Sequence, residues 1–118
     1  MTGLTTHILD TTRGRPASGV EVELHALGPD GARTLVARAR TNADGRTDAP
    51  LIPAAEARAG VFELSFHVGD YFRECGGAAA EPPFLDVVPV RFAIADPDAH
   101  YHVPLVATPW SYSTYRGS

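Results

Sequence analysis

The sequence predicts an all-β sandwich, and three observations lead to that prediction. Apolar residues recur at every second position in several short segments, a spacing typical of strands with one buried face. Short clusters of Gly, Pro, Asn and Asp separate these segments, as turns between strands require. The length of 118 residues suits one domain of seven or eight strands, so a single domain over residues 1–118 is expected.

The alternation is clearest in three segments. In 20–26 and 62–68, apolar residues alternate with glutamate, histidine and serine. In 35–41, Leu35 and two alanines alternate with Val36 and two arginines, which places Leu35 with the buried set. Each segment is therefore predicted as a half-buried strand.

The remaining elements have weaker patterns. Further strands are predicted at 4–9, 84–94, 100–107 and 110–116. Pro89 has no backbone N–H, so its strand is expected at a sheet edge or a bulge. Segment 70–75 is predicted as a short helix, with Asp70 as its N-cap and Gly76-Gly77 as its end.

Composition and charge argue against several classes of function. The formal net charge is −4, which does not suit a broad nucleic-acid surface. The sequence has no apolar run of about 18 residues, so no membrane span is expected. Cys75 is the only cysteine, which leaves neither an internal disulfide nor a Cys-x-x-Cys site. The first residues lack a signal-peptide pattern, and a cytoplasmic protein is expected.

Three of the five histidines are candidates for chemistry. His7 lies opposite the apolar face of its strand, and His100 and His102 share one face of theirs. Such histidines are partly buried structural groups, a catalytic base with its neighbour, or, all three together, zinc ligands. His25 and His67 lie among glutamates on polar faces, where solvated side chains are expected.

Two further features are candidates for binding. Arg46 directly follows the turn Asn42–Gly45 and is either solvated or projected into a cleft, where it would bind an anion or a developing oxyanion. The chain ends in 112–118 with two tyrosines and an arginine. This end is either an ordinary last strand or a docked tail that brings Ser118 into use.

Several segments resemble one known family. The ending Tyr112–Ser118, YSTYRGS, resembles the C-terminal signature of the 5-hydroxyisourate hydrolases, the transthyretin-related proteins. The other similar segments are 4–10, 14–17, 41–46, 89–92 and 100–105. The similarity runs in order and nearly end to end; Trp110 and Ser111 depart from it, since the family more often has tyrosine or phenylalanine and then glycine there.

The resemblance implies a fold, an assembly and a reaction. The fold would be a transthyretin-like (prealbumin-like) sandwich of two four-stranded sheets with one short helix. The assembly would be a homotetramer, a dimer of dimers, with active sites between the dimers. The reaction would be hydrolysis of 5-hydroxyisourate to 2-oxo-4-hydroxy-4-carboxy-5-ureidoimidazoline in urate catabolism, with no metal or other cofactor.

The resemblance also implies roles for individual residues. The catalytic positions of the family match His7, Arg46, His102 and Ser118, and those that place the tail and bind substrate match Tyr115, Arg116 and Gly117. A histidine would activate water and Arg46 would stabilise the oxyanion. The alternative function is a small-ligand carrier of the transthyretin type, although transthyretin lacks the Tyr-Arg-Gly-Ser ending.

Overall fold

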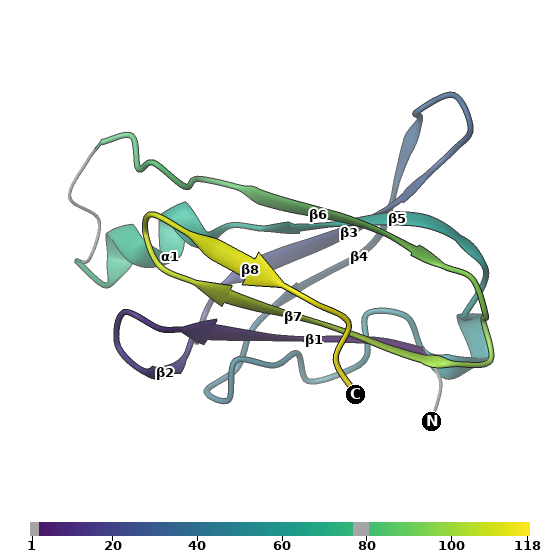
Figure 1. Cartoon of the computed structure of the whole chain (residues 1–118), viewed down its shortest axis with the longest axis horizontal. Coiled ribbons are helices and arrows are strands. Elements are labelled where there is room, and N and C mark those ends of the chain that lie inside the picture. Colours follow the sequence, from purple (N-terminus) through teal and green to yellow (C-terminus); the bar gives the residue numbers. More distant parts are fainter. Residues whose placement is uncertain (1–2, 77–80) are drawn as a thin grey trace.

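Two four-stranded sheets pack against each other in the computed structural model, which describes residues 3–76 and 81–118 (Figure 1). The strands are β1 (Gly3–Asp10), β2 (Arg15–Pro16), β3 (Glu21–Leu27), β4 (Arg33–Arg40), β5 (Gly60–Phe66), β6 (Val88–Ile94), β7 (His100–Ala107) and β8 (Tyr112–Thr114). The helices are the 3-10 helix η1 (Ala54–Glu56) and α1 (Val68–Glu74). The sheet orders are β2-β1-β7-β8 and β4-β3-β5-β6, which confirms the predicted sandwich.

The sheet that contains β1 and β7 has one parallel pair of strands. β1 lies parallel to β7, with Thr5 opposite His102 and His7 opposite Pro104. Residues that are paired across two strands project from the same face of a sheet. The first and the seventh strand therefore bring their polar residues to one common face, although these residues are far apart in the sequence.

The core lies between the two sheets and follows the predicted alternation. Leu4 and Ile8 of β1 and Leu105 of β7 are essentially inaccessible to solvent. The facing sheet contributes Val22, Leu24, Phe62, Leu64 and Phe66, all equally buried. The other face of the β1–β7 pair is left free for His7 and His102, which are only half-buried.

The prediction for β4 was wrong at Leu35. The pairing of β3 with β4 shifts between Leu24 and His25, so that Leu24 lies opposite Ala37 and His25 opposite Leu35. Val36 is the extra residue of this bulge. One inserted residue reverses the alternation beyond it; Leu35 is consequently 49% exposed, and Val36 packs against the core.

The helix also differs from the prediction. α1 begins at Val68, and its N-cap position is His67, which makes no side-chain capping bond. Asp70 is therefore not the cap; its carboxylate accepts a hydrogen bond from Arg73 at 2.7 Å. The alternation of β5 continues as far as Val68, although Val68 is the first residue of α1. The reason is that Val68 lies on the buried face of the helix, directly after the buried end of the strand. Gly76 follows the helix with a φ of 72°, whereas Gly77 lies outside the described residues.

Two strand predictions were right in position and too long. β6 begins at Val88 rather than at residue 84, and β8 covers Tyr112–Thr114 of the predicted 110–116. β6 is an edge strand, as Pro89 indicated. Among the described residues, no helix combines the length and apolar character that crossing a membrane requires.

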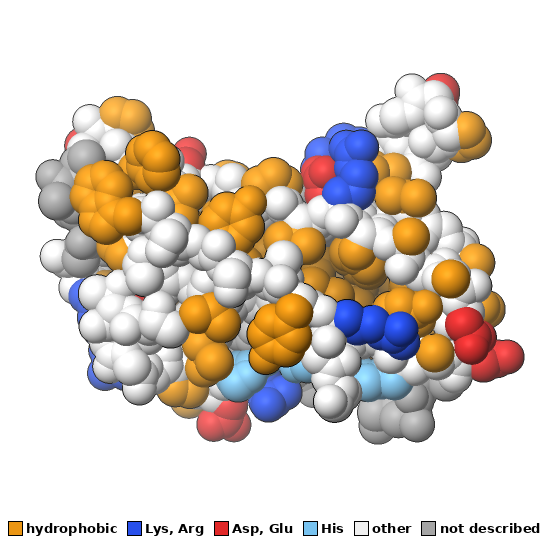
Figure 2. All heavy atoms as spheres, in the orientation of Figure 1, with side chains coloured by type: hydrophobic (Ala, Val, Ile, Leu, Met, Phe, Trp, Pro, Cys, Tyr) orange, Lys and Arg blue, Asp and Glu red, His pale blue; other side chains and the backbone are white. Residues whose placement is uncertain are grey.

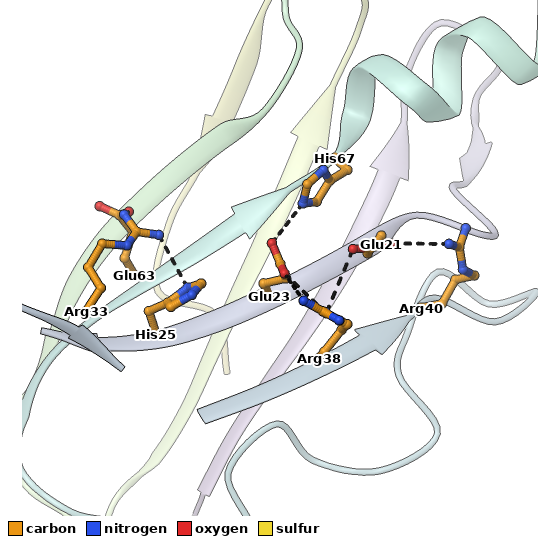
Figure 3. Close-up of polar contacts among 8 residues, drawn as sticks. All are labelled: Glu21, Glu23, His25, Arg33, Arg38, Arg40, Glu63 and His67. Carbon is orange, nitrogen blue, oxygen red and sulfur yellow. Dashed lines mark hydrogen bonds and ion pairs between the residues drawn. The ribbon is translucent and has the colours of Figure 1, made fainter. Parts of the chain in front are cut away.

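The outward face of the β4-β3-β5-β6 sheet carries a network of paired charges (Figure 3). Glu23 accepts hydrogen bonds from Arg38 and lies 3.1 Å from His67 Nε2. Both contacts lower the pKa of Glu23, and the contact with His67 has the larger effect. Glu63, which lies on the polar face of its predicted strand, is only 6% exposed and pairs with both Arg33 and Arg91.

Asp10 is a buried carboxylate that links β1 to α1. It accepts hydrogen bonds from the Tyr71 hydroxyl at 2.8 Å and from Arg13 Nη1 at 3.2 Å. Burial alone would raise the pKa of Asp10, but the bonds from Tyr71 and Arg13 outweigh it, and the pKa is lowered. The carboxylate form is thus favoured by folding.

Tyr71→Phe should reveal this contribution. At pH 7 the variant should lose about 1.5–3 kcal/mol of unfolding free energy, since a bond to a buried charge is removed. Because folding lowers the pKa of Asp10, its carboxylate stabilises the fold at pH values above the pKa of the unfolded state, about 3.9. This stabilisation is lost as the pH falls through the pKa of the folded state. In urea unfolding experiments, the difference in unfolding free energy between the variant and the wild type should therefore become smaller below about pH 4. An equal difference at pH 7 and pH 3 would contradict the role of the Asp10 carboxylate.

Candidate functional site

Half-buried polar side chains gather on the outward face of β1 and β7. His7, His100 and His102 all lie at alternate positions that point away from the core. Figure 2 shows histidine side chains at the lower edge of the molecule, where Figure 1 places β1, β7 and the C-terminus, with a basic side chain among them. The predicted common face of His100 and His102 is confirmed by their stacked rings, whose centroids lie 6.4 Å apart.

A tight turn brings Arg46 to this face. Gly45 N–H donates to the Asn42 carbonyl at 2.9 Å, and the Asn42 side chain accepts a bond from Arg46 N–H at 3.3 Å. Gly45 has a φ of 74°, and its carbonyl accepts a bond from Ile8 N–H at 2.9 Å. The turn is thereby fastened to β1, and Arg46 forms a β-bridge with His7. The bridge and the effect of its charge on both histidines place Arg46 beside this face, and its side chain is exposed in the single chain.

The C-terminal tail is docked beside the second histidine. Gly117 N–H donates to the His102 carbonyl at 2.7 Å. A Cβ atom at Gly117 would lie 2.7 Å from His102 Cδ2, so a larger residue there would displace the histidine ring or the tail. The Arg116 guanidinium lies 4.1 Å from the centre of the Tyr101 ring and donates to the His100 carbonyl at 3.2 Å. These contacts fix residues 116 and 117 to β7.

The predicted site residues are therefore only partly brought together. On the β1 side of the parallel β1–β7 pair, His7 forms a β-bridge with Arg46. On the β7 side, His102 forms a β-bridge with Gly117. Ser118 is exposed and directly follows Gly117. Tyr115 and Arg116 instead line a groove with Phe92, Tyr101 and Val103, at the side of the tail that faces β6.

Both candidate catalytic histidines have lowered pKa values. Burial is the largest cause for His7 and for His102, and the positive charge of Arg46 is the second. His100 and His7 add smaller contributions at His102. A lowered pKa keeps an imidazole neutral, and able to accept a proton, at neutral pH.

The pH dependence of activity should follow from these shifts. Activity that requires a neutral histidine is lost as pH falls through its pKa, so the acid limb of kcat/KM should lie below the ordinary value of about 6.5. The midpoint can be read from initial rates between pH 5 and pH 8. An acid limb centred above pH 7 would contradict the shifts.

Thr5 is a member of this face that the sequence analysis missed. Its hydroxyl lies 2.8 Å from His102 Nδ1 and 3.4 Å from His100 Nε2. The alternation of β1 places Thr5 on the side of His7, which was a usable signal. Its position opposite His102 depends on the parallel pairing of β1 with β7, which no local pattern indicates.

The zinc alternative requires three ligand atoms close together. In the described part of the chain, the one group that meets this condition is Glu21, Glu23 and His67, with ligand atoms within 4.8 Å of one another. His7, His100 and His102 do not form such a group there. Arg38 and Arg40 already pair with the two glutamates, which accounts for that cluster as an ion-pair network.

Comparison with known proteins agrees with this architecture. The sequence matches the HIUase/Transthyretin family over residues 4–117. A protein named 5-hydroxyisourate hydrolase from Deinococcus radiodurans is 62% identical over 116 residues, which cover 98% of this chain and 96% of that protein. The 5-hydroxyisourate hydrolase of Klebsiella pneumoniae has a TM-score of 0.79 and 34% identity, with 100% of both chains covered.

A structure of sea bream transthyretin in complex with thyroxine is also similar. Its TM-score is 0.85 at 32% identity, with 97% of this chain and 93% of that chain covered. The same sandwich thus occurs in proteins that are named as hydrolases and in proteins that are named as transthyretins. From the match over nearly its whole length, this chain belongs to the HIUase/Transthyretin family.

Proposed function

We propose that this enzyme hydrolyses 5-hydroxyisourate to 2-oxo-4-hydroxy-4-carboxy-5-ureidoimidazoline, a step of urate catabolism. The observation that carries the proposal is the placement of Arg46 against His7 on the face that also holds His102. The Deinococcus radiodurans relative, which bears the name of this activity, supports the choice of substrate.

The chemistry is the addition of water to a ring carbonyl. The water oxygen bonds to the carbonyl carbon, and the ring C–N bond then breaks to leave a carboxylate. One histidine takes a proton from water, and this proton then passes to the leaving nitrogen; His7 and His102 share the roles of base and proton shuttle. Arg46 stabilises the negative charge that develops on the carbonyl oxygen.

The tail residues complete the site. The Gly117 bond to the His102 carbonyl holds residues 116 and 117 in place, so that Ser118 follows at the edge of the site. We assign to the Ser118 hydroxyl or carboxylate the orientation of water or of a histidine. Tyr115 and Arg116 support the tail, and Arg116 does so through its contact with Tyr101.

The proposal includes a homotetramer, a dimer of dimers with the sites between the dimers. β6 and β8 each end a sheet, so their outer backbone groups are free to pair with another copy. Arg46 and Ser118 are exposed in a single chain, and exclusion of water by a second dimer would strengthen their electrostatic effect. Light scattering should give four times the mass of one chain; a fully active monomer would contradict this arrangement.

An ultraviolet time course tests the activity. Urate oxidase generates 5-hydroxyisourate in the cuvette, and the protein is then added. The substrate band should disappear faster than by spontaneous decay, in proportion to protein and with saturation by substrate. A folded protein that gives no acceleration would refute hydrolysis and favour a small-ligand carrier.

A further inference from the structure

We propose that Thr5 is a positioning residue that fixes the tautomer of His102, with the ring proton on Nε2. In this tautomer His102 donates a hydrogen bond to the substrate, and His7 is the base. The assignment of catalytic tasks rests on the proposed function, whereas the tautomer does not.

The Thr5 hydroxyl has a single proton to share between two neighbouring histidine rings. A hydroxyl donates one hydrogen bond and accepts others. Thr5 Oγ1 lies 2.8 Å from His102 Nδ1 and 3.4 Å from His100 Nε2, and these rings are its only hydrogen-bond partners in the described part of the chain. Its one proton therefore goes to one ring, and the oxygen accepts from the other ring. Whether the Thr5 hydroxyl donates to His100 or to His102 decides which nitrogen of His102 carries its proton.

His100 determines the direction. Its Nδ1 atom is buried and has no hydrogen-bond partner. If Thr5 donated to His100 Nε2, the proton of neutral His100 would be on Nδ1, as a buried N–H without an acceptor. Orphaned buried N–H groups are rarer than under-satisfied acceptors because the lost bond is costly. The proton of His100 is therefore on Nε2 and points to Thr5.

The position of the His100 proton determines the tautomer of His102. Thr5 accepts from His100 Nε2 and so donates its own proton to His102 Nδ1, which has to be unprotonated. Neutral His102 then carries its proton on Nε2, the nitrogen at the far side of the ring from Thr5. Such a group donates a hydrogen bond to the leaving nitrogen or to an oxygen of the substrate and cannot accept the proton of water.

His7 remains as the proton acceptor. It lies on the same face as His102 and is bridged to Arg46, so water between them would be next to both the base and the oxyanion donor. Among the described hydrogen bonds, none to a side-chain hydroxyl fixes the tautomer of His7. A hydrogen bond between the His7 ring and the Asp44 backbone engages one ring nitrogen, which leaves the other nitrogen free to take up a proton.

Thr5→Val and Thr5→Ser form a matched pair for the test. Valine keeps the shape and removes the hydroxyl, whereas serine keeps the hydroxyl. Nitrogen-15 shifts of the His102 ring, assigned by comparison with His102→Gln, report the tautomer in the folded protein without substrate. Wild type and Thr5→Ser should show the proton on Nε2, and Thr5→Val should show a mixture of both tautomers.

Kinetics provide the second readout. Thr5→Val should lower kcat about 10-fold with little change in KM, and Thr5→Ser should stay within about twofold of wild type, as is usual for residues that orient a catalytic group. A His102 proton on Nδ1 in wild type, or no change of tautomer in Thr5→Val, would overturn the inference. An Nε2 proton in a protein that does not accelerate substrate decay would refute the proposed function and leave the tautomer standing.

Discussion

Arg46→Ala should lower kcat/KM for 5-hydroxyisourate by at least about 100-fold, and His102→Ala should have an effect of the same size. Loss of a positioned oxyanion donor or of a general acid or base typically costs about 10²- to 10³-fold. Arg46 projects from a turn outside the core, so the fold and the assembly should persist. Initial rates in the ultraviolet assay, with light scattering on the same samples, give both quantities.

Arg40→Ala is the matched control for Arg46→Ala. Arg40 is also exposed, but it lies on the other sheet and pairs with Glu21. Its removal should change kcat/KM by less than about twofold, since a surface ion pair contributes little. Arg46→Ala should also raise the pKa of His7 and of His102, because the charge of Arg46 lowers both. Rates within threefold of wild type in either site variant would remove that residue from the mechanism.

Gly45→Ala should lower the free energy of unfolding by about 3 kcal/mol, an unusually large effect for one methyl group. Gly45 has a φ of 74°, and a Cβ there would lie 2.5 Å from the Ile8 carbonyl oxygen. The turn has to move away from β1 to relieve this overlap, and Arg46 moves with it. The variant should therefore lose at least about 10-fold in kcat/KM as well. Urea unfolding and initial rates measure the two effects.

Gly31→Ala separates backbone strain from overlap. Gly31 has a similar φ of 83°, but a Cβ there would meet nothing within 4 Å. Its substitution should cost only about 1 kcal/mol, the penalty for a left-handed conformation, with no loss of activity. Equal destabilisation by the two variants would show that contact with Ile8 does not hold the turn.

The sequence was sufficient to predict most of the sandwich, because alternation is a local signal. The limits of β7 were predicted at 100–107 as they are observed, and Pro89 correctly indicated an edge. Leu35 was placed wrongly because a bulge inserts one residue without any change of composition. The start of α1 was missed since the buried face continues from strand to helix through Val68.

The candidate site was less predictable. Residue types and the C-terminal signature indicated His7, Arg46 and His102, and the structure brings these three to one face. The role of Thr5 and the contact of Gly45 with β1 were not predicted, because each depends on a long-range neighbour. The significance of Thr5 depends on His102, 97 positions away in the sequence, and that of Gly45 on the backbone of Ile8.

The parallel pairing of β1 with β7 also has a consequence for how the protein folds. The β4-β3-β5-β6 sheet is wholly antiparallel and can assemble by successive hairpin-like steps. Contacts between Thr5 and His102 instead close a loop of nearly the whole chain, and such closures are slow. In refolding from urea, we expect catalytic activity to return later than most of the strand signal.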